Sequence, residues 1–260
     1  NTRTEALTYN IQTALDDAED GDTIHAWNGT YFENIEISDE VTLKGNGTST
    51  IINGTSGIAI EISDNDIVVE DLLIISSEKG IFINGAHDVS ISTIRFTGNE
   101  YAVYVEDSQR ALVDNNEFDL EDYGIYFTGS SLSATVEYNK FRNATESAIY
   151  QSESDENGAS GIHHNTFNDC EVGWQSGSSS NTFSYNTLKD NSYGIRLTGI
   201  ESYNNLIDSN SFDDSLVGVF IYNTAYDNKL FNNEFDDSDN SDIKLTDSSD
   251  TVSFNNTFSD

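Results

Sequence analysis

Residues 113–118 read Val-Asp-Asn-Asn-Glu-Phe, and they contain the pattern that decides the fold: an apolar residue, Asn three positions later, and Phe two positions after the Asn. The pattern recurs to the end of the chain, with Leu replacing Phe once and with Val252 displaced by one position in the last copy. Its Asn and Phe or Leu pairs are Asn116/Phe118, Asn139/Phe141, Asn165/Phe167, Asn186/Leu188, Asn210/Phe212, Asn233/Phe235 and Asn256/Phe258. A repeat of this length predicts a solenoid rather than an ordinary globular domain.

A second series has the same period and places a small residue before two apolar residues that are separated by one position. Its copies begin at Gly57, Gly80, Ala102, Gly124, Gly194 and Gly218. Alternation within short segments, interrupted by Gly, Asn, Asp and Ser, predicts strands and turns. The chain contains no Pro, which suits strands that pair on both sides. We therefore expect an all-β chain whose coils, of about 22–24 residues, stack as a parallel β-helix.

The beginning of the chain differs from the repeats. Between Thr4 and Ala18 the apolar residues fall on one helical face, namely Leu7, Ile11, Ala14, Leu15 and Ala18. We predict one domain over 1–260, with a capping helix in 1–20 and β-helical coils in 21–260. The sequence ends directly after a repeat motif, so we expect an uncapped last coil that contacts a following domain or another copy of the chain.

Short motifs follow the cap in a fixed order: Gly21-Asp22-Thr23-Ile24, then Gly29-Thr30-Tyr31-x-Glu33, then Val41-Thr42-Leu43-Lys44-Gly45-Asn46-Gly47. With the coils behind them, they resemble the pectin-lyase-like right-handed parallel β-helix superfamily, and in particular its NosD-like surface repeat proteins. The resemblance covers nearly the whole chain. It implies the right-handed fold and leaves function open, because the superfamily includes lyases, hydrolases, epimerases, viral tailspikes and surface proteins without enzymatic activity.

The charge of the chain excludes several partners. Asp and Glu number 46 against 11 Lys and Arg, a formal net charge of −35, which disfavours nucleic acid and anionic membrane surfaces. No apolar run is long enough to span a membrane. Concentrated salt would screen the repulsion, so we expect an extracellular, cell-surface protein of a halophilic organism, and we expect that organism to be an archaeon. The single cysteine, Cys170, forms no internal disulfide and leaves the redox compartment undetermined.

Aromatic residues lie between the paired apolar positions of four successive coils, at Phe82, Tyr104, Tyr126 and Tyr150. If the alternation holds, they form an outward stripe that Tyr101 and Tyr123 widen. Rings about 4.8 Å apart suit contact with a sugar chain. Packing between coils, or cover by a second molecule, is the alternative interpretation of the same stripe.

Catalytic and metal-binding patterns are weak. Glu106, Asp107, Asp119, Glu121 and Asp122 lie near the stripe, but a chain this acidic brings carboxylates together by chance. We assign no catalytic residue. No cofactor is expected to be required, and Ca²⁺ is the one ion considered, at a candidate site made of Asp236, Asp237, Asp239 and Asp242.

Histidines and glycosylation sequences add two further expectations. His163 and His164 are adjacent, and neighbours on a strand point to opposite faces, so the pair is not expected to share a metal. Asn-x-Ser/Thr sequences, which allow N-glycosylation in a secreted protein, occur at Asn28, Asn46, Asn53, Asn143 and Asn255.

Two functions remain open from the sequence. The first is a structural or adhesive cell-surface protein that self-assembles or binds a polysaccharide. The second is a carbohydrate-active enzyme, a polysaccharide lyase or hydrolase that uses acids beside Tyr104 and Tyr126; a viral tailspike domain is a third reading. The sequence shows none of the lyase, hydrolase or epimerase motifs considered, which favours the first hypothesis.

Overall fold

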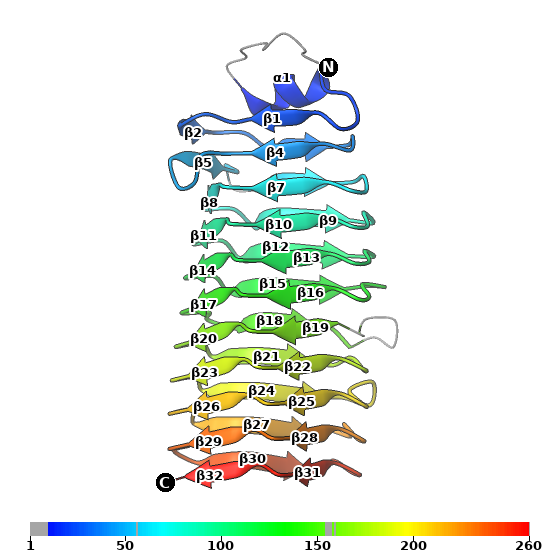
Figure 1. Ribbon diagram of the computed structural model, residues 1–260, viewed down its shortest axis with the longest axis vertical. Helices are drawn as coiled ribbons and strands as arrows, with labels where there is room; N and C mark the ends of the chain where they lie inside the picture. The colour runs from blue at the N-terminus through cyan, green and yellow to red at the C-terminus, as the bar shows by residue number, and fades with distance from the viewer. Residues whose placement is uncertain (1–9, 56, 154–157, 159, 260) are drawn as a thin grey trace.

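The computed structural model describes residues 10–55, 57–153, 158 and 160–259, and these form an elongated parallel β-solenoid (Figure 1). Each coil contributes one strand to each of three parallel sheets, and the strands of a sheet pair with those one coil before and after. The all-β right-handed parallel β-helix predicted from the repeats is confirmed. Figure 1 shows the short helix at one end of the rod and the C-terminus at the other.

Three sheets, which we name A, B and C, contain all strands of the described residues. Sheet A consists of β1 (Thr23–His25), β4 (Thr42–Lys44), β7 (Val68–Glu70), β10 (Ser90–Ser92), β13 (Leu112–Asp114), β16 (Thr135–Glu137), β19 (Gly161–His163), β22 (Thr182–Ser184), β25 (Leu206–Asp208), β28 (Lys229–Phe231) and β31 (Val252–Phe254). Sheet B consists of β2 (Gly29–Tyr31), β5 (Thr50–Asn53), β8 (Leu73–Ile75), β11 (Arg95–Thr97), β14 (Glu117–Asp119), β17 (Lys140–Arg142), β20 (Thr166–Asn168), β23 (Thr187–Lys189), β26 (Ser211–Asp213), β29 (Glu234–Asp236) and β32 (Thr257–Ser259). Sheet C consists of β3 (Ile35–Ile37), β6 (Ile58–Ile62), β9 (Lys79–Asn84), β12 (Tyr101–Glu106), β15 (Tyr123–Thr128), β18 (Ser147–Gln151), β21 (Val172–Ser176), β24 (Tyr193–Thr198), β27 (Val217–Tyr222) and β30 (Ser241–Thr246).

The phenylalanines of the repeat stack inside the solenoid. Phe118 and Phe141 are buried and lie 4.5 Å apart between ring centroids, with their planes within 7° of parallel. Phe167 continues the stack from Phe141 at 4.9 Å. The parallel register brings the same residue type to the same place in each coil, so one core column forms from many distant parts of the sequence.

The repeated asparagines join neighbouring coils and so have a structural role. At the corner between sheets A and B, Oδ1 of Asn165 accepts the backbone N–H of Asn139, and Oδ1 of Asn186 accepts that of Asn165. We name these repeated asparagines the ladder asparagines. The residue before each of them has positive φ, as at Tyr138 and His164. The asparagine therefore satisfies buried backbone groups where the chain turns between two sheets.

Two predicted details of register differ from the structure. The glycine series was aligned at Gly57, but Ile60, not Ile58, pairs with Ile81, so Ala59 takes the small position in that coil. Ala59 is fully buried, and it meets the requirement for a small residue that we assigned to glycine. At the far end, Ser253 pairs with Leu230, which leaves the displaced Val252 half-exposed outside the core column.

Within the described residues the capping helix α1 covers Ile11–Asp16, so it ends two residues before the predicted Ala18; residues 4–9 of the predicted segment, which include Leu7, lie outside the described residues. Ile11 and Leu15 are buried against the first coil. Both carboxylate oxygens of Glu33 accept hydrogen bonds from the backbone N–H groups that begin the helix. This gives the Glu of the Gly-Thr-Tyr-x-Glu motif a role that the sequence did not reveal.

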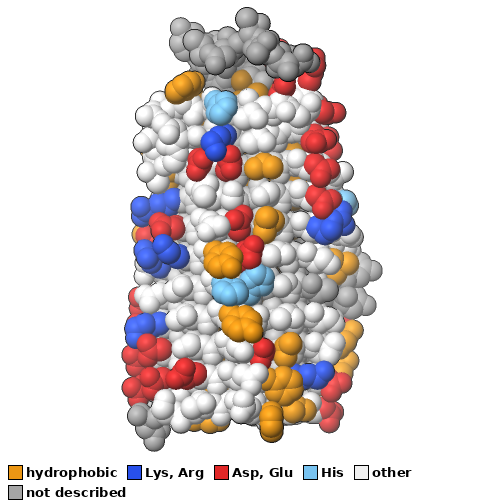
Figure 2. Space-filling view, viewed as in Figure 1, with side chains coloured by type: hydrophobic (Ala, Val, Ile, Leu, Met, Phe, Trp, Pro, Cys, Tyr) orange, Lys and Arg blue, Asp and Glu red, His pale blue; other side chains and the backbone are white. Residues whose placement is uncertain are grey.

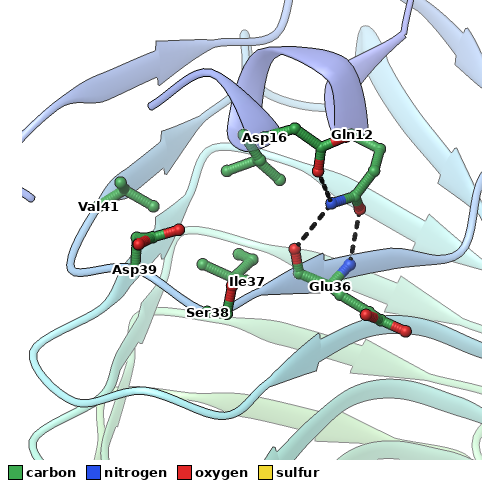
Figure 3. A pocket seen from close by; sticks show the side chains of 8 residues that line it. Gln12, Asp16, Glu36, Ile37, Ser38, Asp39 and Val41 are labelled. Atoms are coloured by element: carbon green, nitrogen blue, oxygen red, sulfur yellow. Dashed lines mark hydrogen bonds between the residues drawn. The ribbon is translucent and has the colours of Figure 1, made fainter. Parts of the chain in front are cut away.

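Gln12 fixes the other side of the cap. Its side-chain amide donates to the carbonyl oxygen of Glu36 at 3.1 Å and accepts from the backbone N–H of Glu36 at 2.8 Å (Figure 3). The cavity beneath, lined in part by Leu15 and Val41, measures about 30 Å³. A space of this size holds no more than about a water molecule, so we assign it no ligand.

Candidate functional site

The predicted aromatic stripe forms on sheet C, in strict register along the rod. Phe82, Tyr104, Tyr126 and Tyr150 pair with one another in four successive strands, β9, β12, β15 and β18. Tyr104 and Tyr126 stack with centroids 5.0 Å apart, and Tyr126 and Tyr150 with centroids 4.7 Å apart. The three tyrosines are half-buried rather than fully exposed.

Phe82 departs from the prediction because its side chain is buried, with 7% exposed. The Nζ atom of Lys79 lies 4.0 Å from the centroid of the Phe82 ring and 3.8 Å from that of Tyr104. Tyr104 also meets Phe82 edge to face at 5.6 Å. The end of the stripe is therefore covered by its own neighbours, and the tyrosines provide the accessible part.

Tyr101 and Tyr123 widen the stripe as a second column, as predicted. Their rings stack at 5.1 Å within 5° of parallel. Each meets the first column edge to face, with Tyr101 at 84° to Tyr104 and Tyr123 at 90° to Tyr126. This herringbone arrangement joins edge-to-face and offset-stacked pairs, the two geometries that aromatic rings prefer. We name the six residues Phe82, Tyr101, Tyr104, Tyr123, Tyr126 and Tyr150 the aromatic face.

The phenol groups of the aromatic face keep their protons at neutral pH. Burial, reinforced by Glu100, raises the pKa of Tyr101 to about 12. Burial also raises the pKa of Tyr104, Tyr123, Tyr126 and Tyr150 above the ordinary value of a phenol. A protonated phenol both donates and accepts hydrogen bonds, so the face offers paired apolar and polar contacts to a ligand.

Cations without carboxylate partners flank the face. Within the described residues, neither Lys79 nor Arg196 has a carboxylate oxygen in ion-pair range, unlike Lys189, which pairs with Asp213. The Arg196 guanidinium lies over the rings of Tyr193 and Tyr222 and donates to the Tyr222 hydroxyl at 3.0 Å. These contacts continue the aromatic character of sheet C beyond the aromatic face.

Glu121, one of the acids near the stripe, is buried, which the sequence analysis did not predict. We expected a surface carboxylate, but its side chain is 1% exposed at the corner between sheets B and C. Its Oε2 accepts the backbone N–H of Asn99 at 2.6 Å, while Oε1 has no hydrogen-bond partner among the described residues. Burial raises the pKa of Glu121 to about 8, with Asp119 and Asp122 adding to the shift. Its place in the series of Asn99 and Asn191, which cap the same corner, was the signal available in the sequence.

The acids predicted to bind Ca²⁺ lie at the turn between β29 and β30. Asp237, Asp239 and Asp242 line a shallow hollow of about 420 Å³ with Asp214, whereas Asp236 accepts the Ser259 hydroxyl. The described residues contain no group of three or more His, Cys, Asp or Glu side chains placed to hold a metal ion. The calcium site at this turn therefore stays a prediction.

The two adjacent histidines contradict the prediction that they point apart. His163 ends β19, but His164 follows with φ 57°, which breaks the alternation of a strand. Their Nδ1 atoms lie 3.1 Å apart. His25 is exposed on β1, and Nδ1 of His87 accepts the backbone N–H of Gln109.

The remaining predicted positions are the glycosylation asparagines and Cys170. Four of the predicted glycosylation asparagines, Asn28, Asn46, Asn143 and Asn255, are exposed, and Asn53 is half-buried. Burial raises the pKa of the Cys170 thiol to about 11, which keeps it protonated and unreactive at neutral pH. In the part of the chain that the structure describes, no helix is long and apolar enough to cross a membrane.

Structural comparison finds the same fold in solved structures that include carbohydrate-active enzymes. The catalytic unit of a GH87 α-1,3-glucanase from Streptomyces thermodiastaticus strain HF3-3 superimposes with a TM-score of 0.80 at 15% identity, over 91% of this chain and 52% of the glucanase. An alginate lyase from Paenibacillus sp. str. FPU-7 gives 0.64 at 12% identity, over 95% of this chain and 96% of the lyase. Identities this low show the fold alone.

Sequence comparison is more specific. A cell surface glycoprotein of Methanothermus fervidus is 35% identical over 96 residues, which are 35% of this chain and 16% of that protein. The family model described as "Periplasmic copper-binding protein (NosD)" matches residues 32–213 and 146–260. The molecule is thus a pectin-lyase-like parallel β-helix protein of the extracellular or cell-surface space. Within that class, it belongs to the NosD family.

The copper in the family's description can be tested against the donors of this chain. The sequence has no Met, its one Cys is buried, and the described residues form no cluster of three or more metal-binding side chains. A closed site of three or four protein ligands does not fit these residues.

Proposed function

We propose that this chain is a rigid, adhesive segment of a cell-surface protein and that it binds a polysaccharide along the aromatic face. The observation that carries the proposal is the register of Tyr104, Tyr126 and Tyr150, whose rings repeat at 5.0 and 4.7 Å on one side of the rod. The structural class and surface location stand on the comparisons, whereas adhesion and the polysaccharide are inferred from the face.

The geometry favours an extended ligand over a single sugar. Four coils at a strand spacing of about 4.8 Å give the face a length of roughly 14 Å along the rod. Sugars present apolar C–H groups and hydroxyls together, and half-buried phenols offer ring edges beside protonated hydroxyls. The hydroxyls of Tyr104 and Tyr126 make no hydrogen bond to another described side chain, so a ligand can use them.

The charge supports a second part of the proposal, that the protein works in concentrated salt in a halophilic organism, which we expect to be archaeal. A net charge of −35 repels itself strongly at low ionic strength. Figure 2 shows acidic side chains along both edges of the face that it displays. At about 1 M salt the screening length falls to roughly 3 Å, which removes most of this repulsion.

Binding to a panel of neutral and uronate-containing polysaccharides tests the proposal. We compare the wild type with the double variant Tyr104→Ala/Tyr126→Ala and with the matched control Tyr138→Ala/Tyr185→Ala, which removes two exposed tyrosines outside the aromatic face. We expect saturable binding that the first variant weakens by at least about tenfold, equivalent to 1.4 kcal/mol. No binding across the panel, or equal weakening in the control, would overturn the proposal.

The same samples test the enzymatic alternative. A lyase would produce unsaturated ends and a hydrolase new reducing ends in the polysaccharides that bind. Asp122 accepts a hydrogen bond from the Thr145 hydroxyl, and Glu121 is buried, which favours structural roles for these two acids. We expect binding without new chain ends.

A further inference from the structure

A column of carboxylates runs along one edge of the aromatic face. In five successive coils an acidic residue stands immediately before the strand of sheet C, and the parallel register of these strands gives the five equivalent positions. All five residues are exposed, and none of them forms an ion pair within the described residues. We name them the acid column: Glu78, Glu100, Asp122, Glu146 and Glu171.

The acid column acts on the tyrosines beside it. Burial raises the pKa of Tyr101, and Glu100 adds to the shift. Burial likewise raises the pKa of Tyr123, and Glu146 adds to it. Glu106, the last residue of β12, places a carboxylate on the opposite edge of the face. The rings therefore lie between negative charges, an arrangement that attracts a positively charged ligand.

The rings of sheet C already hold cations of the chain itself. Every cation–ring contact within the described residues lies on this sheet, and the cations are those of Lys79, Arg196 and Lys244. The face of an aromatic ring attracts an ammonium group through its quadrupole. Within the part of the chain that the structure describes, no cation lies over Tyr126 or Tyr150. These two rings can therefore offer an external ammonium the contact that Lys79 makes with its neighbours.

We propose that the polysaccharide on the aromatic face contains amino sugars with free amino groups, whose ammonium ions lie over the tyrosine rings and beside the acid column. The inference rests on the proposed function, since it assigns a charge to the ligand of that same face. The acids recur once per coil, about 4.8 Å apart, so successive sugars of an extended chain meet carboxylates in turn. Each exposed contact is weak, and a strong preference requires several of them in one chain.

An acidic sugar chain is the alternative ligand. It is suggested by Lys79 and Arg196, which flank the face and have no carboxylate partner within the described residues. Between these two cations, however, the acid column follows the rings from coil to coil, and the whole chain has a net charge of −35. Uronate groups would meet more negative than positive charge along the face. The observations therefore favour the amino sugar.

Three oligosaccharides of equal length and linkage test the inference: oligomers of glucosamine, of N-acetylglucosamine and of glucuronic acid. Calorimetry measures their affinities at about 0.1 M and about 1 M NaCl, in a mildly acidic buffer that keeps the amino groups protonated. The variant Glu100→Gln/Glu146→Gln removes two charges of the acid column. The matched control Asp227→Asn/Glu234→Gln removes two exposed charges away from the face, in the turn before β28 and on β29.

We expect the wild type to bind the glucosamine oligomer at least about tenfold more tightly than the N-acetylglucosamine oligomer in about 0.1 M NaCl, and the glucuronate oligomer most weakly. About 1 M NaCl should reduce this preference, because the screening length falls from roughly 10 to 3 Å. Glu100→Gln/Glu146→Gln should lower the preference by at least about threefold, whereas the control should leave it unchanged.

Two results would overturn the inference and leave the proposed function standing, provided that Tyr104→Ala/Tyr126→Ala still weakens binding. The first is a glucosamine oligomer that binds no more tightly than one of the other two, which needs no variant to fold. The second is an equal loss of preference in the acid-column variant and its control. If none of the three oligomers binds, both the inference and the proposed function are overturned.

Discussion

Asn165 and Asn186 are joined twice: the backbone N–H of Asn165 donates to Oδ1 of Asn186 at 2.8 Å, and Nδ2 of Asn165 donates to the same oxygen at 3.1 Å. Oδ1 of Asn165 in turn accepts the backbone N–H of Asn139. One side chain thus connects three coils, and we expect it to set much of the cooperativity of the rod.

Replacing Asn165 with Ala should lower the free energy of unfolding by roughly 3–5 kcal/mol. The change leaves the N–H of Asn139 and the carbonyl oxygen of Val136 buried without these partners, and each such group costs about 1–3 kcal/mol. Urea denaturation followed by circular dichroism measures the change. Asn84→Ala, which removes an exposed amide on sheet C, is the control and should have little effect. Equal stabilities of the two variants would contradict the role of the ladder.

The repeats predict the fold well because every coil contains the same pattern of residues. An apolar residue, a ladder asparagine and a core phenylalanine recur together, so an error in one coil leaves the others intact. The first copy of the glycine series shows the limit, since Gly57 and Ala59 are both small and only the pairing of Ile60 with Ile81 decides between them. The aromatic face was predictable for the same reason: its residues alternate with buried ones.

Single positions that break the repeat were not predictable from their local sequence. Glu121 occupies a corner where other coils place Asn99 or Asn191, and nothing in its local sequence separates a buried carboxyl from the many exposed ones. His164 was assigned to a strand, but the chain turns one residue earlier and rotates its ring to the side of His163. Both cases depend on contacts between coils that are 20 or more residues apart in sequence.

Glu121→Gln should remove one source of pH dependence. The pKa of about 8 lies above the ordinary 4.5, so the folded state holds a proton that the unfolded state has released. Stability therefore falls as pH rises through this window, by up to about 1.4 kcal/mol per pH unit, and levels off above it. The amide stays neutral and its oxygen can still accept the N–H of Asn99.

Urea denaturation at several pH values between 5 and 9 measures this effect. We expect Glu121→Gln to flatten the decline and to be more stable than the wild type at pH 8. Glu106→Gln, at a half-exposed carboxylate of sheet C, is the control and should leave the slope unchanged. Coinciding slopes for Glu121→Gln and the wild type would show that Glu121 is ionised in the folded protein.

Phe141→Ala should destabilise the core by about 3–5 kcal/mol. Phe141 is buried between Phe118 and Phe167, and its removal leaves a cavity that two stacked neighbours border. Thermal unfolding of the variant gives the change. Phe254→Ala, at a side chain that is 71% exposed, should change stability by less than about 0.5 kcal/mol. A similar loss in both would mean that the stacked column contributes little.

Raising NaCl from about 0.1 M to about 1 M should increase the melting temperature, because the screening length falls from roughly 10 to 3 Å. Differential scanning calorimetry provides the measurement. CaCl₂ at matched ionic strength distinguishes screening from specific binding of Ca²⁺, which would stabilise the protein more than NaCl does. A melting temperature that stays constant or falls with NaCl would remove the support for adaptation to salt.

The polysaccharide-binding role of the aromatic face is tested most directly by a crystal structure with an oligosaccharide from the polysaccharide that binds. We predict that the sugar chain lies along sheet C, with its rings or hydroxyls in contact with Tyr104, Tyr126 and Tyr150. An oligosaccharide bound on sheet A or B, with the aromatic face empty, would contradict the proposal.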